Sequence, residues 1–382
     1  MAGELLISAG PGEWRAAWVE DGEAVEVYVE RGDTKPAGSR HLGRVVQVVP
    51  ALDAVLVDIG DERPGFLPVR DVPAGTKSEE GARIVVEVRR EAWQDKAPRL
   101  TAKLSEPHFA APADLNPPAQ LFPAPGLAAA LALRLPASPS RIITDDVASL
   151  AELRRAFPDA DIGQRPVADW PIDLDALLDT ATSPRVALDN GGVAHIEETR
   201  AATMIDVDTG TPARGSPARA ALAANLAAVR LIAKELRLRN IGGAVVIDFV
   251  GLDRRDHRER LRQVLEAALA PDPQNPQLLG WTRLGHIELM RPRRCRSLAD
   301  ALLEPGSRAK RPIAIAYEAL RRIQREARAN PSANWRLSVS REVAEALRGA
   351  VSEALRALEN RLGRPIAIEV AEGHQGFDIG PL

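Results

Sequence analysis

Apolar and polar residues alternate over short runs between Ser39 and Leu104, which is the pattern of β-strands. Turn residues separate these runs, which read "RVVQVV", "AVLVDIG", "GFLPV", "ARIVVEVRREAW" and "RLTAKL". Several short strands within about 65 residues predict a small closed barrel of the OB type. Phe66 follows an Asp-Glu-Arg-Pro-Gly turn, and its ring could either stack on a nucleic-acid base or fill the core of the barrel.

A helical period replaces this alternation between Ser216 and Asn240. The apolar positions of that period fall on one face and are Leu222, Leu226, Val229, Ala233 and Leu236. Ser216 is a suitable N-cap, Pro217 suits the first helical position, and Gly242 follows the end. The apolar run "AATMIDV" precedes this helix and "GGAVVIDFV" follows it. The pattern predicts a βαβ unit with two parallel strands and a right-handed crossover.

Carboxylates follow both strands of this βαβ unit. Asp206 and Asp248 end equivalent strands, and Asp208 shares a face with Asp206 because side chains alternate along a strand. Parallel strands bring their C-terminal ends to one edge of the sheet, where α/β proteins usually bind ligands. Gathered carboxylates repel one another unless a hard cation such as Mg²⁺ neutralises them. The alternative is that these aspartates only cap the following turns.

The segments outside these two units have weaker patterns. Six prolines lie between Glu106 and Gly126, which excludes long regular structure there and marks a boundary. From Leu127 to about Thr182 the pattern is mixed, with a strand in "SRIITDD" and a helix in "DDVASLAELRRAF". The C-terminal part combines the helical runs "AYEALRRIQREAR" and "SREVAEALRGAVSEALRALENRLG" with a strand "PIAIEVAE". These helices could pack on that strand or pair with a second copy of the chain.

Composition places the chain among globular proteins of two or three domains, with 382 residues of which 45% are hydrophobic. The net charge is −3, but 13 Lys and Arg against 8 Asp and Glu lie between Gly251 and Arg311. The run "RPRRCR", from Arg291 to Arg296, suits phosphates or forms a solvated face. The lone Cys295 excludes an internal disulfide. We expect a cytoplasmic protein, because the N-terminal stretch lacks a basic signal region and no apolar run is long enough to span a membrane.

With these residues in view, the chain resembles the ribonuclease E/G family of bacterial endoribonucleases. The resemblance follows the chain in order over most of its length. "HLGRVVQVVPALDAVLVDIGDERPGFLPVRDV" resembles the S1-type RNA-binding barrel of the family. "EETRAATMIDVDTGTPARG" and "NLAAVRLIAKELRLRNIGGAVVIDFVGLDRRDHRERL" resemble its two active-site strands and the helix between them. "TRLGHIELMRPRR" resembles the basic segment that follows.

The resemblance implies an Mg²⁺-dependent endoribonuclease that cleaves single-stranded RNA and leaves a 5′ phosphate and a 3′ hydroxyl, with Mn²⁺ as the alternative ion. It implies that Asp206 and Asp248 are the metal ligands and that Asp208 takes the second polar position of the site. Phe66 matches a barrel aromatic that packs on RNA. Three arginines match basic residues near the scissile region: Arg283, Arg291 and Arg293.

The resemblance also implies a multidomain α+β and α/β architecture. Residues 1–38 would begin an RNase H-like region, and residues 39–105 would form an S1 barrel inserted into it. Residues 106–190 would hold the linker and a shortened continuation of the RNase H-like region. Residues 191–305 would form a DNase I-like catalytic subdomain, and residues 306–382 a small C-terminal α/β domain.

Several positions depart from the family pattern. Asp208 stands where the family usually has Asn, and Arg200 stands near the site where it usually has Glu. Leu56 replaces the second RNA-facing aromatic of the barrel. The Val-Arg-Thr motif of the 5′-phosphate pocket is not found, and Arg141 and Thr144 are the nearest residues of that type.

These departures leave two hypotheses: an active endoribonuclease, or an RNA-binding protein of the same family whose active site has drifted. The paired aspartates favour the enzyme, whereas Arg200 and Leu56 favour the binding protein. The cysteine pair that links subunits through zinc in some members is also missing. We therefore expect no zinc, and a monomer or a homodimer formed through the C-terminal domain.

Overall fold

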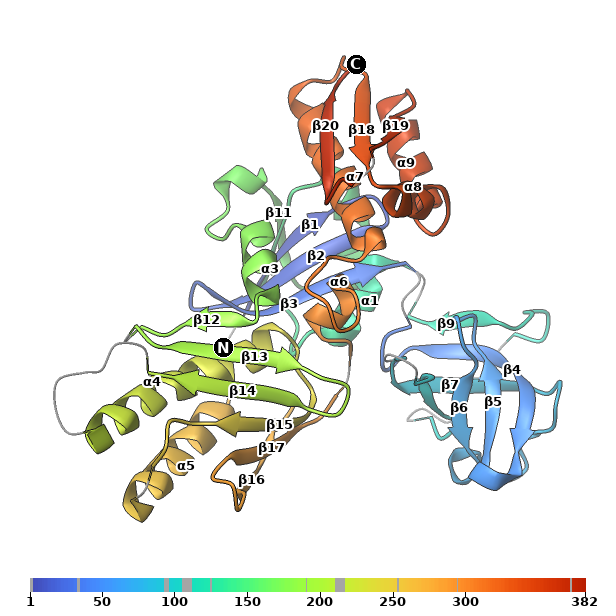
Figure 1. Ribbon diagram of the computed structural model, residues 1–382. Coiled ribbons are helices and arrows are strands. Elements are labelled where there is room, and N and C mark those ends of the chain that lie inside the picture. The colour runs from blue at the N-terminus through green and yellow to red at the C-terminus, as the bar shows by residue number, and fades with distance from the viewer. Residues whose placement is uncertain are drawn as a thin grey trace.

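The computed structural model describes residues 3–32, 35–92, 96–104, 112–123, 126–189, 191–209, 217–252, 254–293, 295–371 and 373–382. Within these residues the chain is a mixed α/β protein of several domains, built on four sheets. Figure 1 shows one sheet at the centre, the barrel on one side, a larger sheet on the other, and the C-terminal module at the top. The expected N-cap, Ser216, lies outside the described residues.

The central sheet joins two segments that are far apart in sequence. Its strand order is β11-β10-β1-β2-β3, and β1 runs parallel to β10. The chain therefore leaves this sheet for the barrel and returns to it afterwards (Figure 1). The strands are β1 Glu4–Ala9, β2 Glu13–Glu20, β3 Glu23–Arg31, β10 Arg141–Thr144 and β11 Asp161–Gln164. The helices of this part are α1 Leu127–Arg134, α2 Leu150–Ala156 and α3 Leu174–Thr182.

The barrel confirms the prediction from alternating residues. Its strands follow the order β5-β6-β8-β7-β4, pairing between β5 and β4 closes the ring, and β9 adds to β4 outside it. The strands are β4 Arg40–Val49, β5 Ala54–Asp58, β6 Gly65–Pro68, β7 Arg83–Arg90, β8 Arg99–Thr101 and β9 Ala119–Phe122. Branched residues such as Val55, Val57 and Leu67 fill the core. Phe66 is half-buried and does not belong to that core.

A second six-stranded mixed sheet contains the predicted βαβ unit. Its order is β12-β13-β14-β15-β17-β16, and β14 and β15 are adjacent and parallel, as predicted. The strands are β12 Arg185–Ala187, β13 Val193–Glu198, β14 Thr203–Asp208, β15 Gly243–Asp248, β16 Gln277–Trp281 and β17 Ile287–Arg291. Helices α4 Pro217–Leu238 and α5 Arg255–Leu269 pack their apolar side chains on one face. Figure 1 shows both helices on that side, and we call the opposite side the open face.

The C-terminal module packs helices on a three-stranded sheet of order β19-β18-β20. Its elements are α7 Pro312–Ala329, β18 Trp335–Val339, α8 Arg341–Arg348, α9 Ser352–Leu362, β19 Ala367–Val370 and β20 Phe377–Pro381. The short helix α6 Leu298–Leu302 before it packs on the central sheet. Leu320 of α7 and Leu347 of α8 share one core with Leu337 of β18. The sequence analysis allowed these helices either to pack on their own strand or to pair with a second copy of the chain. Their apolar faces pack on their own sheet.

A buried ion-pair network holds α7 against the central sheet. Glu13 of β2 pairs with Arg321 of α7, and also with Arg15 at 3.0 Å and Arg31 at 2.8 Å. Burial alone would raise the pKa of Glu13, but the guanidinium groups of Arg31, Arg15 and Arg321 hold that pKa at about 2. Buried ion pairs thus attach the C-terminal module to the central sheet.

Candidate active site

The two predicted carboxylates stand side by side at one edge of the open face. In the parallel pairing of β14 and β15, Asp206 lies directly opposite Asp248. Neighbouring strands are about 4.8 Å apart, so the two side chains emerge at that spacing. Buried and exposed residues alternate along β14, with Ile205 and Val207 buried on the helix side and Asp206 exposed. Both carboxylates therefore project from the open face.

Asp208 extends the same line of side chains along β14. It is exposed, it shares the parity of Asp206, and it lies opposite Val193 of β13. Because β15 ends at Asp248, the strand that faces Asp206 does not continue beside Asp208. Asp208 therefore lies at the rim of the sheet, next to the carboxylate pair but not between its members.

Two histidines that sequence reasoning did not place at the site flank the carboxylates. His195 of β13 lies opposite Asp206. His286 precedes β17, and its Nε2 is 3.5 Å from Oδ2 of Asp248. The open face thus carries the row His195, Asp206, Asp248 and His286 across four adjacent strands. The only signal in the sequence is strand parity, since His286 alternates with the buried Ile287 and Leu289.

The donor set of this edge fits a hard divalent cation. Asp206 and Asp248 offer exposed carboxylate oxygens at neighbouring strand ends, which is how proteins hold Mg²⁺ while leaving its other positions to water and phosphate. Within the described ranges, no three Asp, Glu, His or Cys side chains are close enough to enclose an ion on their own. The residues therefore fit an ion bound at an open edge, with the protein supplying only part of its ligands.

Arg283 lies where an approaching phosphate could meet it. It is exposed in the turn between β16 and β17, three residues before His286. The same turn exposes Leu284 at 83% of its surface. Arg283 therefore extends the carboxylate edge with a positive charge that is open to solvent.

Arg291 does not form the RNA contact expected from the sequence. It is only 2% exposed, and its Nε donates to Oδ2 of Asp272 at 2.7 Å. Its Nη1 donates to the carbonyl oxygen of Ile241 at 2.9 Å, and its Nη2 donates to Oδ1 of Asp272 at 3.3 Å. Every nitrogen of the guanidinium has a partner inside the protein, so Arg291 joins β17 to the loop after α5.

Arg293 is intermediate in exposure between the buried Arg291 and the exposed Arg283. It is partly buried and donates from Nη2 to the carbonyl oxygen of Gly242. A Cβ at Gly242 would lie 2.9 Å from the Cα of Arg293, and one at Gly243 would lie 2.6 Å from its Nη2. Both glycines therefore allow this close approach. The left-handed residue after the end of α4 is Asn240, not Gly242. Arg294 of the same run lies outside the described residues.

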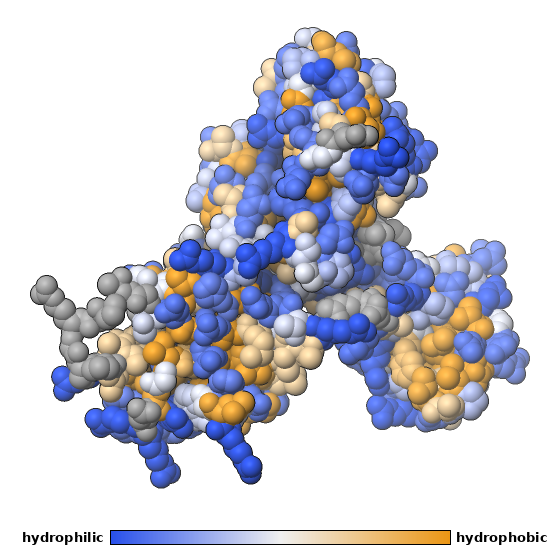
Figure 2. Space-filling model, in the orientation of Figure 1, coloured by the Kyte–Doolittle hydropathy of each residue, from blue (hydrophilic) through white to orange (hydrophobic). Residues whose placement is uncertain are grey.

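The outer surface of the barrel presents Phe66 beside Leu56. The two residues are opposite each other on β6 and β5, and Arg99 of β8 pairs with Phe66 on its other side. Val46 and Val48 of β4 are also exposed. Figure 2 shows apolar surface on the barrel. The half-buried ring of Phe66 is accessible on this surface.

Two further residues named in the sequence analysis are not part of the carboxylate edge. Arg200 is in the turn before β14, so about 10 Å of strand separates that turn from Asp206. Its charge is therefore at the opposite end of the strand from the carboxylates. Thr144 is fully buried, and its hydroxyl is bonded to Ser149 at 2.9 Å, so it offers no pocket for a terminal phosphate.

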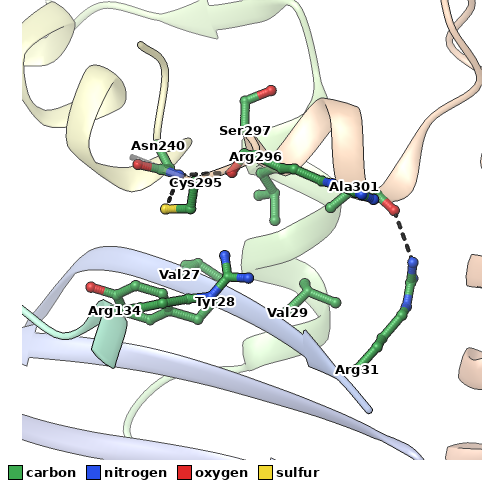
Figure 3. A pocket seen from close by; sticks show the side chains of 11 residues that line it. Val27, Tyr28, Val29, Arg31, Arg134, Asn240, Cys295, Arg296, Ser297 and Ala301 are labelled. Atoms are coloured by element: carbon green, nitrogen blue, oxygen red, sulfur yellow. Dashed lines mark hydrogen bonds between the residues drawn. The ribbon is translucent and has the colours of Figure 1, made fainter. Parts of the chain in front are cut away.

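Cys295 is an ordinary buried thiol. Its Sγ accepts a hydrogen bond from Asn240 at 2.7 Å, and Asn240 also donates to the carbonyl oxygen of Arg296 (Figure 3). Burial raises the pKa of Cys295 to about 11. The adjoining cavity has a volume of only about 50 Å³, which is too small for a nucleotide.

Comparison with known proteins finds similarity in the part of the chain that holds the carboxylates. A sequence model of the Ribonuclease E/G family matches residues 159–294, which include β14 and β15. Ribonuclease G of Escherichia coli (strain K12) is 24% identical over 487 aligned residues, covering 99% of each chain. Ribonuclease G of Haemophilus influenzae is 26% identical, with 98% of this chain and 99% of the relative covered. Ribonuclease E of Synechocystis is 25% identical over 73% of this chain and 55% of its own length.

The two ribonuclease G alignments run through the central sheet, the barrel, the carboxylate edge and the C-terminal module. Both are longer than the 382 residues of this chain, so these relatives carry insertions relative to it. The family model spans the strands whose register brings Asp206 opposite Asp248. The chain is thus similar to the ribonuclease E/G family over residues 159–294 and to ribonuclease G along nearly its whole length.

Proposed function

We propose that this protein is a metal-dependent endoribonuclease that cleaves single-stranded RNA and leaves a 5′ phosphate and a 3′ hydroxyl. The observation that carries the proposal is the register of β14 and β15, which brings the exposed Asp206 and Asp248 together at one sheet edge. Two adjacent carboxylates in solvent repel each other mildly, and a bound cation would remove that repulsion. The relatives named ribonuclease G support RNA as the substrate.

The proposal assigns a role to each part of the chain. Residues 39–105 act as the S1-type barrel that holds RNA, and residues 191–305 act as the DNase I-like catalytic subdomain. Residues 1–38 and 106–190 form the shortened RNase H-like region that connects them. Residues 306–382 form the small C-terminal domain.

At the cleavage site, Asp206 and Asp248 would hold Mg²⁺, and Asp208 would add a polar oxygen beside them. When bound, the ion supplies positive charge to the phosphoryl centre and lowers the pKa of water there. The register of β14 and β15 fixes where on the sheet edge Asp206 and Asp248 would hold the ion. Arg283 neutralises a phosphate next to the scissile bond, since its guanidinium lies in the adjacent turn and is exposed.

RNA is held away from the cleavage site by the barrel. Phe66 stacks on a base, because its ring is accessible on the outer surface and stacking contributes roughly 1 to 3 kcal/mol per base. Leu56 beside it offers apolar contact without an aromatic face. Arg293 attracts RNA through its positive charge rather than through a direct hydrogen bond from Nη2, because Nη2 already donates to the carbonyl oxygen of Gly242.

A cleavage assay with matched variants tests the proposal. Internally labelled single-stranded RNA is incubated with Mg²⁺, with Mn²⁺ or with EDTA, and the product ends are identified. We expect cleavage only with an ion, and its loss in Asp206→Asn and Asp248→Asn, with RNA affinity and thermal unfolding unchanged. Asp256→Asn is the control, because Asp256 is exposed on α5 and pairs with Arg254. Wild-type cleavage by either site variant would refute the metal site.

The second candidate function is RNA binding without catalysis. It is favoured by the open site, in which no three described ligand side chains enclose an ion, and by Leu56 in place of an aromatic. RNA binding that persists in EDTA, with no cleavage under any divalent ion, would establish it.

A further inference from the structure

The open face carries exposed apolar side chains close to the carboxylate edge. Met204 of β14 and Met290 of β17 are exposed at 40% and 41%. Buried and exposed residues alternate along both strands, so Met204 projects from the same face as Asp206, and Met290 from the same face as Glu288. Figure 2 shows apolar surface over this sheet. Exposed apolar area beside a candidate active site marks a surface that suits a ligand.

The strand pairing places both methionines beside β15. Met204 lies opposite Val246, and Met290 lies opposite Ala244. Val246 and Ala244 are half-buried, and both share the face of Asp248 because each is an even number of residues from it. We call Met204, Val246, Ala244 and Met290 the methionine platform. Val246 comes two residues before Asp248, so the platform begins about 7 Å from the carboxylate pair.

Exposed glutamates border the methionine platform on two sides. Glu197 of β13 lies opposite Met204, and Glu288 of β17 lies opposite Val246. Both glutamates are exposed. Their negative charges, together with those of the carboxylate pair, repel phosphate groups from this part of the face. The platform therefore disfavours the backbone of a nucleic acid, whereas a base is uncharged and has two apolar faces.

We propose that the methionine platform binds the base of a nucleotide next to the scissile phosphate, and that Glu288 selects cytosine over uracil there. This proposal deepens the proposed function and rests on its assignment of the cleavage site to Asp206 and Asp248. A flat ring fits on Val246 and Ala244 between the two methionines, and thioether sulfur makes favourable contacts with aromatic rings.

The selectivity follows from the hydrogen-bonding capacity of a carboxylate. Glu288 is the cross-strand neighbour of Val246, so its carboxylate lies at the edge of a base on the platform. An ionised carboxylate only accepts hydrogen bonds. It therefore accepts one from the 4-amino group of cytosine and repels the 4-carbonyl oxygen of uracil.

The competing occupant of the platform is a second copy of this chain. An exposed apolar sheet face is also suited to an interface between proteins. A two-fold contact through this face would, however, bring Glu197, Glu288 and the carboxylate pair of one copy against the same groups of the other. Repulsion between these like charges opposes that contact, so the charges favour an RNA base as the occupant.

Methionine oxidation reads the platform directly, because the chain has only three methionines, and Met1 serves as the internal reference. The full-length protein is treated with dilute hydrogen peroxide, alone or with oligocytidine or oligouridine of equal length. Mass spectrometry then measures sulfoxide formation at Met204 and Met290. EDTA keeps both oligonucleotides intact, so the result does not depend on cleavage. We expect both to slow the oxidation, with half-protection by oligocytidine at a concentration about threefold or more below that for oligouridine.

Glu288→Gln is the variant that tests the selectivity. An amide both donates and accepts hydrogen bonds, so it serves cytosine and uracil alike. We expect the ratio of the two half-protection concentrations to fall to about one. Glu345→Gln is the matched control, because Glu345 is exposed on α8 of the C-terminal module, and it should keep the wild-type ratio. Thermal unfolding of each variant shows whether its fold is kept.

Each outcome decides what the platform does. Oxidation rates that RNA does not change, or a wild-type ratio that persists in Glu288→Gln, overturn the base site even if the wild type cleaves RNA with Mg²⁺. Protection whose ratio depends on Glu288, in a chain that cleaves no RNA under any divalent ion, supports the base site and overturns the proposed function. Protection that grows with protein concentration in the absence of RNA overturns the base site and assigns the platform to a second copy.

Discussion

At the scale of single residues, position within a strand decides what an arginine does. Arg291 has the parity of Ile287 and Leu289, so it points to the helix side and is buried with Asp272. Arg283 lies in the turn outside the strands and remains exposed. The two arginines belong to one basic segment, yet only Arg283 is available to a phosphate.

This difference predicts separate effects for the two arginines. Arg291→Ala should destabilise the fold by about 3 to 5 kcal/mol, because it leaves the buried Asp272 without its partner. Arg283→Ala should leave stability unchanged and flatten the salt dependence of RNA binding by about 0.7 per lost phosphate contact. Chemical denaturation and RNA titrations at several salt concentrations check both. A stable Arg291→Ala protein with a flatter salt dependence would reverse the assignment.

Asp208 gives a second prediction at this scale. It lies at the rim beside Asp206, on the side where β15 has already ended. Asp208→Asn keeps an oxygen ligand, lowers the negative charge of the edge by one, and introduces the residue that the resemblance associates with this position. We expect most of the cleavage activity to remain, measured on the same labelled RNA. Complete loss of cleavage in a folded variant would make the Asp208 carboxylate an obligatory ligand.

At the scale of elements, local patterns predicted the units that carry the site. Alternating residues predicted the barrel, and the helical period between two apolar runs predicted the parallel pair β14 and β15. These patterns suffice because the strands of the βαβ unit are joined by one helix with a fixed handedness. The position of Asp206 next to Asp248 follows from that unit alone.

The rest of the site depends on antiparallel pairings that no local pattern specifies. His286 reaches Asp248 only because β17 pairs with β15 in one register, and His195 faces Asp206 only through the register of β13. A shift by one residue would turn His286 to the helix side. Arg200 was expected near the site from the family resemblance, but it precedes β14 whereas Asp206 lies near the C-terminal end of that strand.

The barrel offers a pH prediction for an element. His41 of β4 is fully buried, and its Nε2 is 2.9 Å from Oγ of Ser39. Burial, assisted by Lys35, lowers the pKa of His41 from 6.5 to about 4. The neutral imidazole therefore stabilises the fold above pH 6.5, and this stabilisation, about 3 kcal/mol, is lost as the pH falls from 6.5 through 4.

Hydrogen exchange of the amides in β4 and β7 measures this effect. Protection in the wild type should fall between pH 6.5 and 4 after correction for intrinsic exchange rates, and His41→Gln should show a smaller fall. His257→Gln on α5 is the control. An equal fall in wild type and His41→Gln would assign the acid sensitivity to other groups.

At the scale of the whole molecule, the ion pairs between α7 and the central sheet connect segments from opposite ends of the chain. Glu13 contributes when ionised, since its folded pKa of about 2 is below the ordinary 4.5. Its contribution is complete above pH 4.5 and is lost as the pH falls through 2. Glu13→Gln should cost about 3 kcal/mol or more, because the buried Arg15, Arg31 and Arg321 would surround a neutral amide.

Limited proteolysis and thermal unfolding check this docking. Glu13→Gln should expose the segment before α7 to protease and lower the unfolding temperature of the C-terminal module. Asp256→Asn, which breaks the exposed pair with Arg254, should leave both unchanged. Identical behaviour of the two variants would show that the Glu13 network does not hold the module.

The last prediction concerns assembly without zinc. A zinc link needs four ligands, usually thiolate or imidazole, and a cysteine must lose its proton to become a ligand. Cys295 is 9% exposed, its Sγ faces Asn240, and burial raises its pKa to about 11, so it stays a thiol inside its own chain. The helices of the C-terminal module cover their own sheet, and α7 is docked on the central sheet. We therefore expect a monomer or a homodimer whose mass, measured by light scattering, does not change when a zinc-selective chelator is added. A larger assembly that loses zinc and falls apart on chelation would contradict this expectation.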